Sequence, residues 1–199
     1  MKKLSILAFL CLVLLLLEVG ALPRQGATAS PPILLTSCGQ SPGPAIIKVV
    51  LQRLGLPFEL EPLATAASLQ KKKESGQPYG SVIIVMGASL KGMGAAGISI
   101  EDEIKRISQL IQEARKQGLK VIGAHVEGLK RRAQGAAAGD TTDEQSIDAV
   151  APQSDILLVN KEGNADGRFT AIARNKNIPL VEVEKNMDLV EELRKIYGK

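Results

Sequence analysis

The chain has 199 residues, of which 45% are hydrophobic and only 3% aromatic, so one domain with an aliphatic core is expected. Its 25 Lys and Arg residues nearly balance its 21 Asp and Glu residues, and they form no single basic stripe. This balance and the scarcity of aromatic side chains for base stacking argue against a nucleic-acid partner.

The first 30 residues have the pattern of an export signal. Lys2 and Lys3 precede an apolar run over residues 4–17, and small residues follow at 19–21. The run is shorter than the roughly 20 residues that span a bilayer, which favours a cleaved signal over a permanent anchor. We therefore expect a signal peptide over 1–21, a linker over 22–30, and a secreted, periplasmic or cell-surface protein. Contact with the membrane is then expected only through the signal segment, if it stays uncleaved.

The two cysteines predict a fold without a disulfide. Cys11 lies within the apolar run of the signal, so Cys38 has no intramolecular partner once the signal is removed. The exported domain must then be held together by its core alone, which some 170 residues can manage.

From residue 31 onward, apolar runs typical of strands alternate with segments of helical periodicity. The run SVIIVM at 81–86 is continuous and β-branched, as expected for a strand that is buried on both faces. The predicted strands cover residues 32–37, 58–60, 81–86, 119–124, 155–159 and 180–183. The predicted helices cover residues 44–54, 64–73, 100–117, 142–150, 166–175 and 187–197.

This alternation predicts a single α/β domain over 31–199, a three-layer sandwich around a mainly parallel sheet of five to six strands. The order of the strands is flavodoxin-like or Rossmann-like. Right-handed crossovers place all strand-to-helix loops at one edge of the sheet, and ligands bind there at the point where the strand order reverses. In a flavodoxin-like order, that crevice lies between the first and third strands.

The loop after the first strand reads TSCGQSPG over residues 36–43. Free N–H groups at the start of the following helix favour an anion, and side chains and backbone of the loop add donors. The expected ligand-binding residues are Ser37, Gly39, Gln40 and Ser41. The alternative is a tight turn in which Ser41 is the N-cap and Pro42 the first helical residue.

Cys38 also has two interpretations. A thiol near a helix N-terminus has a lowered pKa and can act as a nucleophile, whereas a small residue at a strand end is often simply buried.

The loop after the third strand, residues 87–97, contains five glycines and lacks the terminal G-K-[ST] of a P-loop. It is also a poor match to a dinucleotide fingerprint, so no cofactor is assigned. The candidate ligand-binding residues are Gly87, Ser89, Lys91, Gly92 and Gly94. The alternative is a mobile surface loop.

The segment HVEG at the end of the fourth strand contains His125, the only histidine of the chain, and Glu127. Two-residue spacing in an extended segment puts both side chains on the same side, where they could form an acid/base pair. A metal site needs a third ligand, which Asp140, Asp143 or Glu144 could supply, but an exposed strand end is the simpler interpretation and no metal is assigned.

Residues 128–140 are rich in Gly and Ala and resemble a lid, in which Arg131 and Arg132 could close over an anion.

Four segments together resemble a bacterial exported α/β domain family of unknown function. They are T-S-x-G-Q-S at 36–41, G-x-S-x-K-G-M-G-x-x-G at 87–97, D-E-x-S-I-D-x-V-A-P at 143–152 and G-N-x-D-G at 163–167. The resemblance extends over essentially the whole mature chain. It implies export and an α/β fold, and it implies no particular reaction.

Three functions are compatible with these patterns. The first is an exported protein that binds a small anionic molecule between the loops of the first and third strands. The second is a hydrolase or transferase that uses His125 or Glu127 as acid/base. The third is a protein-interaction module at the cell surface.

Overall fold

The computed structural model describes residues 29–133 and 141–199. The predicted signal peptide, most of the predicted linker and residues 134–140 of the predicted lid lie outside the described residues. Ala29, which falls in the predicted linker, is buried, and its N–H donates to the carbonyl of Ile196 (3.0 Å). None of the helices in the described part of the chain has the length and apolar character needed to cross a membrane.

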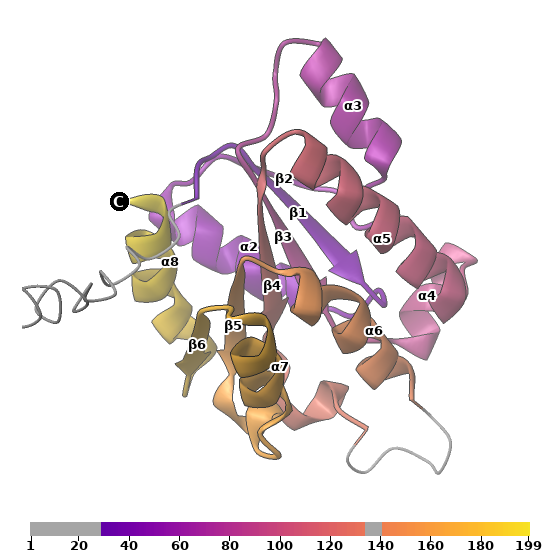
Figure 1. The fold of residues 1–199 in the computed structure, drawn as a ribbon, viewed down its shortest axis with the longest axis vertical. Coiled ribbons are helices and arrows are strands. Elements are labelled where there is room, and N and C mark those ends of the chain that lie inside the picture. Colours follow the sequence, from indigo (N-terminus) through magenta and orange to yellow (C-terminus); the bar gives the residue numbers. More distant parts are fainter. Residues whose placement is uncertain (1–28, 134–140) are drawn as a thin grey trace, which may run out of the picture.

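Six parallel strands form one sheet in the order β2-β1-β3-β4-β5-β6 (Figure 1). This is the flavodoxin-like alternative of the predicted fold, and its strand order reverses between β1 and β3. β1 and β3 pair along their full lengths, from Ile33 opposite Ser81 to Cys38 opposite Met86. The strands are β1 (Ile33–Cys38), β2 (Phe58–Leu60), β3 (Ser81–Met86), β4 (Lys120–His125), β5 (Ile156–Asn160) and β6 (Leu180–Val183).

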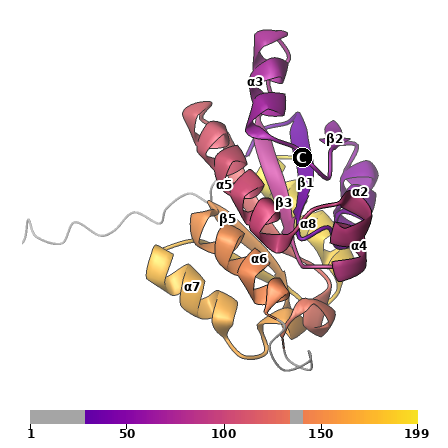
Figure 2. The ribbon, with the colours of Figure 1, turned by 90° about the vertical axis from the view of Figure 1, so that its right-hand side faces the viewer.

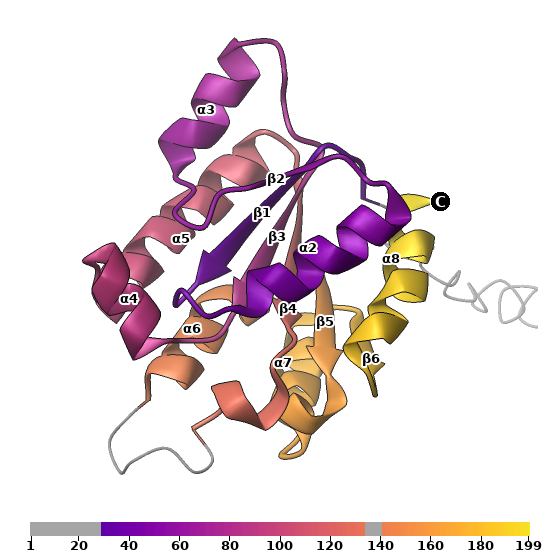
Figure 3. The same ribbon diagram turned by 180° about the vertical axis from the view of Figure 1, so that it is seen from behind.

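Helices cover both faces of the sheet, which confirms the three-layer sandwich. Helices α5, α6 and α7 lie on one face, and α2 and α8 lie on the other, as the side view and the view from behind show (Figures 2 and 3). Helix α3 packs against α5. It lies near the amino ends of the strands, away from the arrow tips (Figure 1). The helices are α2 (Gly43–Leu54), α3 (Ala66–Glu74), α4 (Leu90–Ala96), α5 (Ile100–Lys116), α6 (Thr142–Val150), α7 (Arg168–Lys176) and α8 (Leu189–Tyr197).

Alternate residues of the central strands enter two aliphatic cores, one on each side of the sheet. On β3, Val82 and Ile84 pack toward α5 and α6, while Ile83 and Val85 pack toward α2 and α8. All six residues of β3 are buried, as the unbroken run of β-branched residues predicts. The predicted strands are confirmed to within one residue, so the carboxyl edge of the sheet contains the loops that were expected there.

The main difference from the expected elements is in the glycine-rich segment after β3. Residues 90–96 form helix α4 and not a loop, and Ser89 is its N-cap, with Oγ accepting from the N–H of Gly92 (3.1 Å). Four of the seven residues of the helix are Gly or Ala, and Gly87 and Gly97 flank it, which obscured the helical pattern because periodicity is read from larger apolar side chains.

Candidate functional site

The loops after β1 and β3 lie against each other at the point where the strand order reverses. The N–H of Ser89 donates to the carbonyl of Gly39 (2.7 Å), and the N–H of Gly87 donates to the carbonyl of Cys38 (3.2 Å). Gln40 and Ala88 form an isolated antiparallel bridge between the loops. The crevice that was expected between these strands is thus occupied by the loops themselves.

Two of the predicted ligand-binding glycines serve this close packing. A Cβ on Gly39, whose φ is +101°, would lie 2.6 Å from the carbonyl oxygen of Gly87. A Cβ on Gly92 would lie 2.1 Å from the carbonyl oxygen of Gln40. Both distances are far below van der Waals contact, so the glycines allow two backbones to approach each other.

The polar donors of both loops bind carboxylates of the protein. Glu103 of α5 accepts from the N–H of Gly39 (3.2 Å) and from Nε2 of Gln40 (2.7 Å), and it is paired with Arg106 (2.6 Å). The N–H of Ala88 donates to Asp143 of α6 (2.6 Å). Acidic side chains of the chain therefore already occupy positions where an anionic ligand was expected.

The start of α2 is also a weaker anion site than the sequence predicted. Pro42 is the N-cap, so Ser41 is not, and Oγ of Ser41 accepts from the N–H of Gly43 (3.3 Å). Pro44 has no N–H, and the N–H of Ala45 donates to the carbonyl of Pro42 (3.0 Å). Of the first three residues of the helix, none offers a free N–H to a ligand.

Cys38 and Ser37 are buried at the end of β1. Burial, together with the nearby Glu103 carboxylate, raises the pKa of the Cys38 thiol to about 12. A buried thiol with a raised pKa stays protonated at neutral pH, which favours the alternative of a small residue buried at a strand end. On α4, Lys91 and Gly94 are exposed to solvent.

His125 lies in the interior on the face covered by α7. Its ring is fully buried, packs against Phe169 with centroids 5.1 Å apart, and contacts the carbonyl oxygen of Arg131 through Nε2 (3.0 Å). A carbonyl only accepts, so Nε2 holds the proton and Nδ1 is an acceptor without a partner among the described residues. Burial lowers the pKa of His125, and the cationic Arg132 nearby lowers it further.

The side chain of Glu127 points away from His125 and toward Gly43, the first residue of α2. Its Oε2 would be 3.1 Å from a Cβ on Gly43, and its Oε1 pairs with Nε of Arg131 (3.3 Å). The expected acid/base pair is therefore not formed. Strand β4 ends at His125 and the chain turns into a 3-10 turn, Gly128–Arg131, so the alternation of a strand no longer applies to Glu127.

Neither predicted lid arginine is free to hold an anion. Arg131 donates to the carbonyl of Ala88 (2.8 Å) in addition to its pairing with Glu127. Arg132 is buried between Glu144 (2.8 Å) and Asp166 (2.5 Å) and lies over the ring of Phe169. These ion pairs fasten the end of β4 to α6 and to the loop before α7.

The residues considered as metal ligands do not converge either. Within residues 29–133 and 141–199, no three His, Cys, Asp or Glu side chains are grouped so that they could hold a metal ion. Asp140 lies outside the described residues, Asp143 binds Ala88 and Glu144 binds Arg132.

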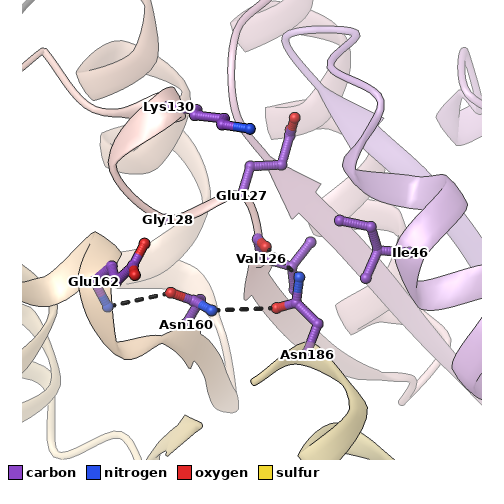
Figure 4. A pocket seen from close by; sticks show the side chains of 8 residues that line it. All are labelled: Ile46, Val126, Glu127, Gly128, Lys130, Asn160, Glu162 and Asn186. Atoms are coloured by element: carbon purple, nitrogen blue, oxygen red, sulfur yellow. Dashed lines mark hydrogen bonds between the residues drawn. The ribbon is translucent and has the colours of Figure 1, made fainter. Parts of the chain in front are cut away.

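A cavity of about 300 Å³ opens at the carboxyl edge of the sheet, on the face that α2 and α8 cover (Figure 4). In the view of Figure 4, Lys130 and Glu127 lie at the top, Glu162 on the left, Ile46 on the right, and Asn160 and Asn186 below. It is lined by Ile46, Val126, Glu127, Gly128, Lys130, Asn160, Glu162 and Asn186. Of the predicted site residues, only Glu127 is among them.

The cavity combines one apolar wall with several polar groups. Ile46 and Val126 supply the apolar wall. Asn160 accepts from the N–H of Glu162 (3.1 Å) and donates to Oδ1 of Asn186 (3.4 Å), whose Nδ2 donates to the carbonyl of Val126 (2.9 Å). These bonds fix both amides in place, and rigid polar groups next to an apolar wall are typical of a small-molecule site.

Sequence reasoning missed most of this cavity because its residues come from the ends of β4, β5 and β6. Asn160 closes a buried strand and Asn186 follows the last strand, so polar residues at strand ends were a usable signal. The glycine-rich loops instead directed the prediction to the ends of β1 and β3.

Comparison with known protein families decides the membership of this chain. The model of a domain of unknown function, DUF6305, matches residues 30–197. The chain belongs to the DUF6305 family. This confirms the expected membership of an α/β family of unknown function. No curated protein matches the chain.

Among solved structures, the chain is similar to an acetyl xylan esterase, AlAXEase, with 12% identity over 81% of each chain and a TM-score of 0.38. It is also similar to a putative lipolytic protein of the G-D-S-L family from Desulfitobacterium hafniense DCB-2, with 15% identity over 75% of each chain and a TM-score of 0.35. Such low scores have no bearing on what this chain does.

Proposed function

We propose that this chain binds a small anionic molecule at the carboxyl edge of its sheet, in the cavity beside Lys130. The observation that carries the proposal is that Lys130, whose side chain lines the cavity, has no ion-pair partner in the part of the chain that the structure describes. Of the neighbouring cations, Arg131 pairs with Glu127, Arg132 with Glu144 and Asp166, and Lys161 with Glu184. Lys91 and Lys185 at the same edge also form no ion pair among the described residues, but neither lines the cavity.

The size and position of the cavity agree with this proposal. About 300 Å³ is at the lower end of the range for small-molecule sites, which suits a small metabolite. The carboxyl ends of parallel strands are where open α/β sheets bind their ligands. The site lies beside β4, β5 and β6, next to the position between β1 and β3 that the sequence predicted.

The hydrolase or transferase alternative has less support from the site. His125 is fully buried, holds its Nε2 proton on a backbone carbonyl and does not line the cavity. A general acid or base has to reach the substrate within hydrogen-bond distance, directly or through one water.

Export remains part of the proposal and rests on residues 1–21 alone. N-terminal sequencing of the protein secreted by its own host, or by a bacterial expression host, tests it. A start near residue 22 supports export, and recovery of the intact chain from the cytoplasm contradicts it.

The binding proposal can be tested by titrating the protein with acetate, citrate and inorganic phosphate in two-dimensional ¹H–¹⁵N NMR. We expect shifts of amides that line the cavity, at Gly128, Lys130 and Glu162. Lys130→Ala should weaken binding of the best anion at least about tenfold, because it removes the unpaired cation.

Lys91→Ala is the matched control, since Lys91 is also an exposed lysine and lies on α4, outside the cavity. It should leave binding unchanged. Loss of binding with Lys91→Ala and retention with Lys130→Ala would place the anion at the loops of β1 and β3 and overturn the cavity as the site. If no anion binds the wild type, the proposed function fails.

A further inference from the structure

The cavity beside Lys130 also contains two carboxylates, which a purely anionic ligand would have to tolerate. Glu127 and Glu162 both line it, and like charges in one small site repel. The charge on Glu127 is partly balanced by Arg131, whereas the carboxylate of Glu162 has no ion pair or hydrogen bond among the described residues. One cation and one anion, Lys130 and Glu162, are thus left unpaired on the cavity wall.

We infer that the ligand is a zwitterion, a small amino acid whose anionic group pairs with Lys130 and whose ammonium group pairs with Glu162. This inference rests on the proposed function and adds the second charge of the ligand. An amino acid supplies both charges within one small molecule, so it neutralises both unpaired side chains together.

Glu127 is the second carboxylate of the cavity. Its side chain is nine-tenths buried, yet Oε2 has no hydrogen-bond partner in the part of the chain that the structure describes. A buried carboxylate oxygen without a donor is costly, typically by about 1–3 kcal/mol or more for a charged group. Figure 4 shows this carboxylate at the top of the cavity beside Lys130, and Oε2 faces Gly43 at the start of α2. Glu127 therefore adds negative charge at the end where Lys130 lies, and Glu162 is the carboxylate left for the ammonium group.

The two amides add further acceptors to the same wall. Asn160 and Asn186 each use an amide N–H in the internal bonds described above, and their Oδ1 atoms each accept one hydrogen bond. Each oxygen has a second lone pair that can accept another donor. Each amide nitrogen likewise has a second N–H, so the two amides keep equal numbers of free donors and acceptors. The carboxylate of Glu162 gives the wall its excess of acceptors, as a site for an ammonium group requires.

The apolar side of the cavity indicates the remaining part of the ligand. Ile46 of α2 lies across the cavity from Glu162, and Val126 lies between them beside Asn186 (Figure 4). They suit an aliphatic carbon skeleton, and about 300 Å³ leaves room for a side chain of modest size. The expected class is therefore the aliphatic amino acids.

The test uses matched pairs of ligands and calorimetry on the full chain. Leucine is compared with 4-methylpentanoate, which lacks the amino group, and with 3-methylbutylamine, which lacks the carboxylate. Alanine and propanoate form a second, smaller pair. We expect each amino acid to bind at least about tenfold more tightly than its single-charge analogues.

Glu162→Gln should remove this preference. It should weaken the binding of leucine about tenfold and leave the affinity for 4-methylpentanoate unchanged. Glu101→Gln, at an exposed position in the first turn of α5, is the matched control and should change neither affinity.

The failures of the two proposals are distinguishable. If 4-methylpentanoate binds as tightly as leucine, or if Glu162→Gln does not affect leucine, the zwitterion inference is overturned and the anion site stands. If 3-methylbutylamine binds as tightly as leucine, the anionic group contributes nothing and both proposals fail. If neither the amino acids nor any simple anion binds, the proposed function itself is refuted.

Discussion

The carbonyl oxygen of Gln40 lies so close to Gly92 that a Cβ on Gly92 would come within 2.1 Å of it. Gly92 belongs to α4, where alanine is otherwise favoured over glycine by about 1 kcal/mol. We nevertheless expect Gly92→Ala to lower the free energy of unfolding by about 1–3 kcal/mol, because the backbones of the two loops must move apart. Urea denaturation followed by circular dichroism measures the change.

Gly94→Ala is the control in the same helix. A Cβ on Gly94 would have nothing within 4 Å, so we expect this variant to be more stable than wild type by about 0.5–1 kcal/mol. Equal effects of the two substitutions would contradict the close packing of the loops.

Glu103 holds the loop after β1 in place from the buried face of α5. We expect Glu103→Ala to lower the free energy of unfolding by about 3–5 kcal/mol, because it removes the carboxylate partner of Arg106 and the acceptor of the Gly39 N–H. Arg106 and Nε2 of Gln40 then keep only their bonds to backbone carbonyls. The measurement is again urea denaturation. Glu101→Ala, at an exposed position on the same helix, should change stability by less than about 1 kcal/mol, and a similar loss in both variants would refute the role of Glu103.

The burial of His125 predicts a dependence of stability on pH. Its pKa is lowered in the folded state, so the ring stays neutral there while the unfolded chain takes up a proton below the ordinary value of 6.5. This contribution to stability is fully present above pH 6.5 and is lost as the pH falls below it. The slope from this one group reaches at most about 1.4 kcal/mol per pH unit.

The variant His125→Gln tests this pH dependence. The amide nitrogen of glutamine can still donate to the carbonyl of Arg131, and glutamine does not titrate. The stability of wild type relative to this variant should decrease between pH 7.5 and pH 5. A constant difference over that range would mean that His125 is not the group responsible.

Cys38 should be unreactive in the folded protein, since it is buried and its pKa is raised to about 12. A chain with Cys11→Ser has Cys38 as its only thiol. We expect no reaction of this chain with Ellman's reagent at pH 8 until a denaturant is added, when one equivalent should react. Rapid labelling of the native protein would restore Cys38 as a candidate nucleophile.

The architecture was largely readable from local patterns. The continuous run of Val and Ile at 81–86 identified the central strand, and the alternation of strands with helices identified a parallel sheet with helices on both faces. Both signals depend on the spacing of apolar side chains along the chain, and the burial of β3 on both faces confirms them. Export, by contrast, remains a prediction from residues 1–21.

The helix α4 shows where such patterns fail. Its residues LKGMGAA contain little apolar periodicity, and the glycines suggested a flexible loop. Its N-cap bond from Gly92 to Ser89 is local, but the reason for glycine at position 92 is the backbone of Gln40, more than fifty residues earlier in the chain. No local pattern contains that contact.

The sequence by itself determined the fold class, because periodicity and chain order dictate it, and it predicted a site at the carboxyl edge of the sheet. Only the tertiary structure decided which polar groups are available there. Glu103 and Asp143 come from distant helices and occupy the donors of the glycine-rich loops, while Lys130 and Glu162 meet at one cavity without a partner of their own among the described residues. Pairing between charges depends on distance in space, which the order of residues does not specify.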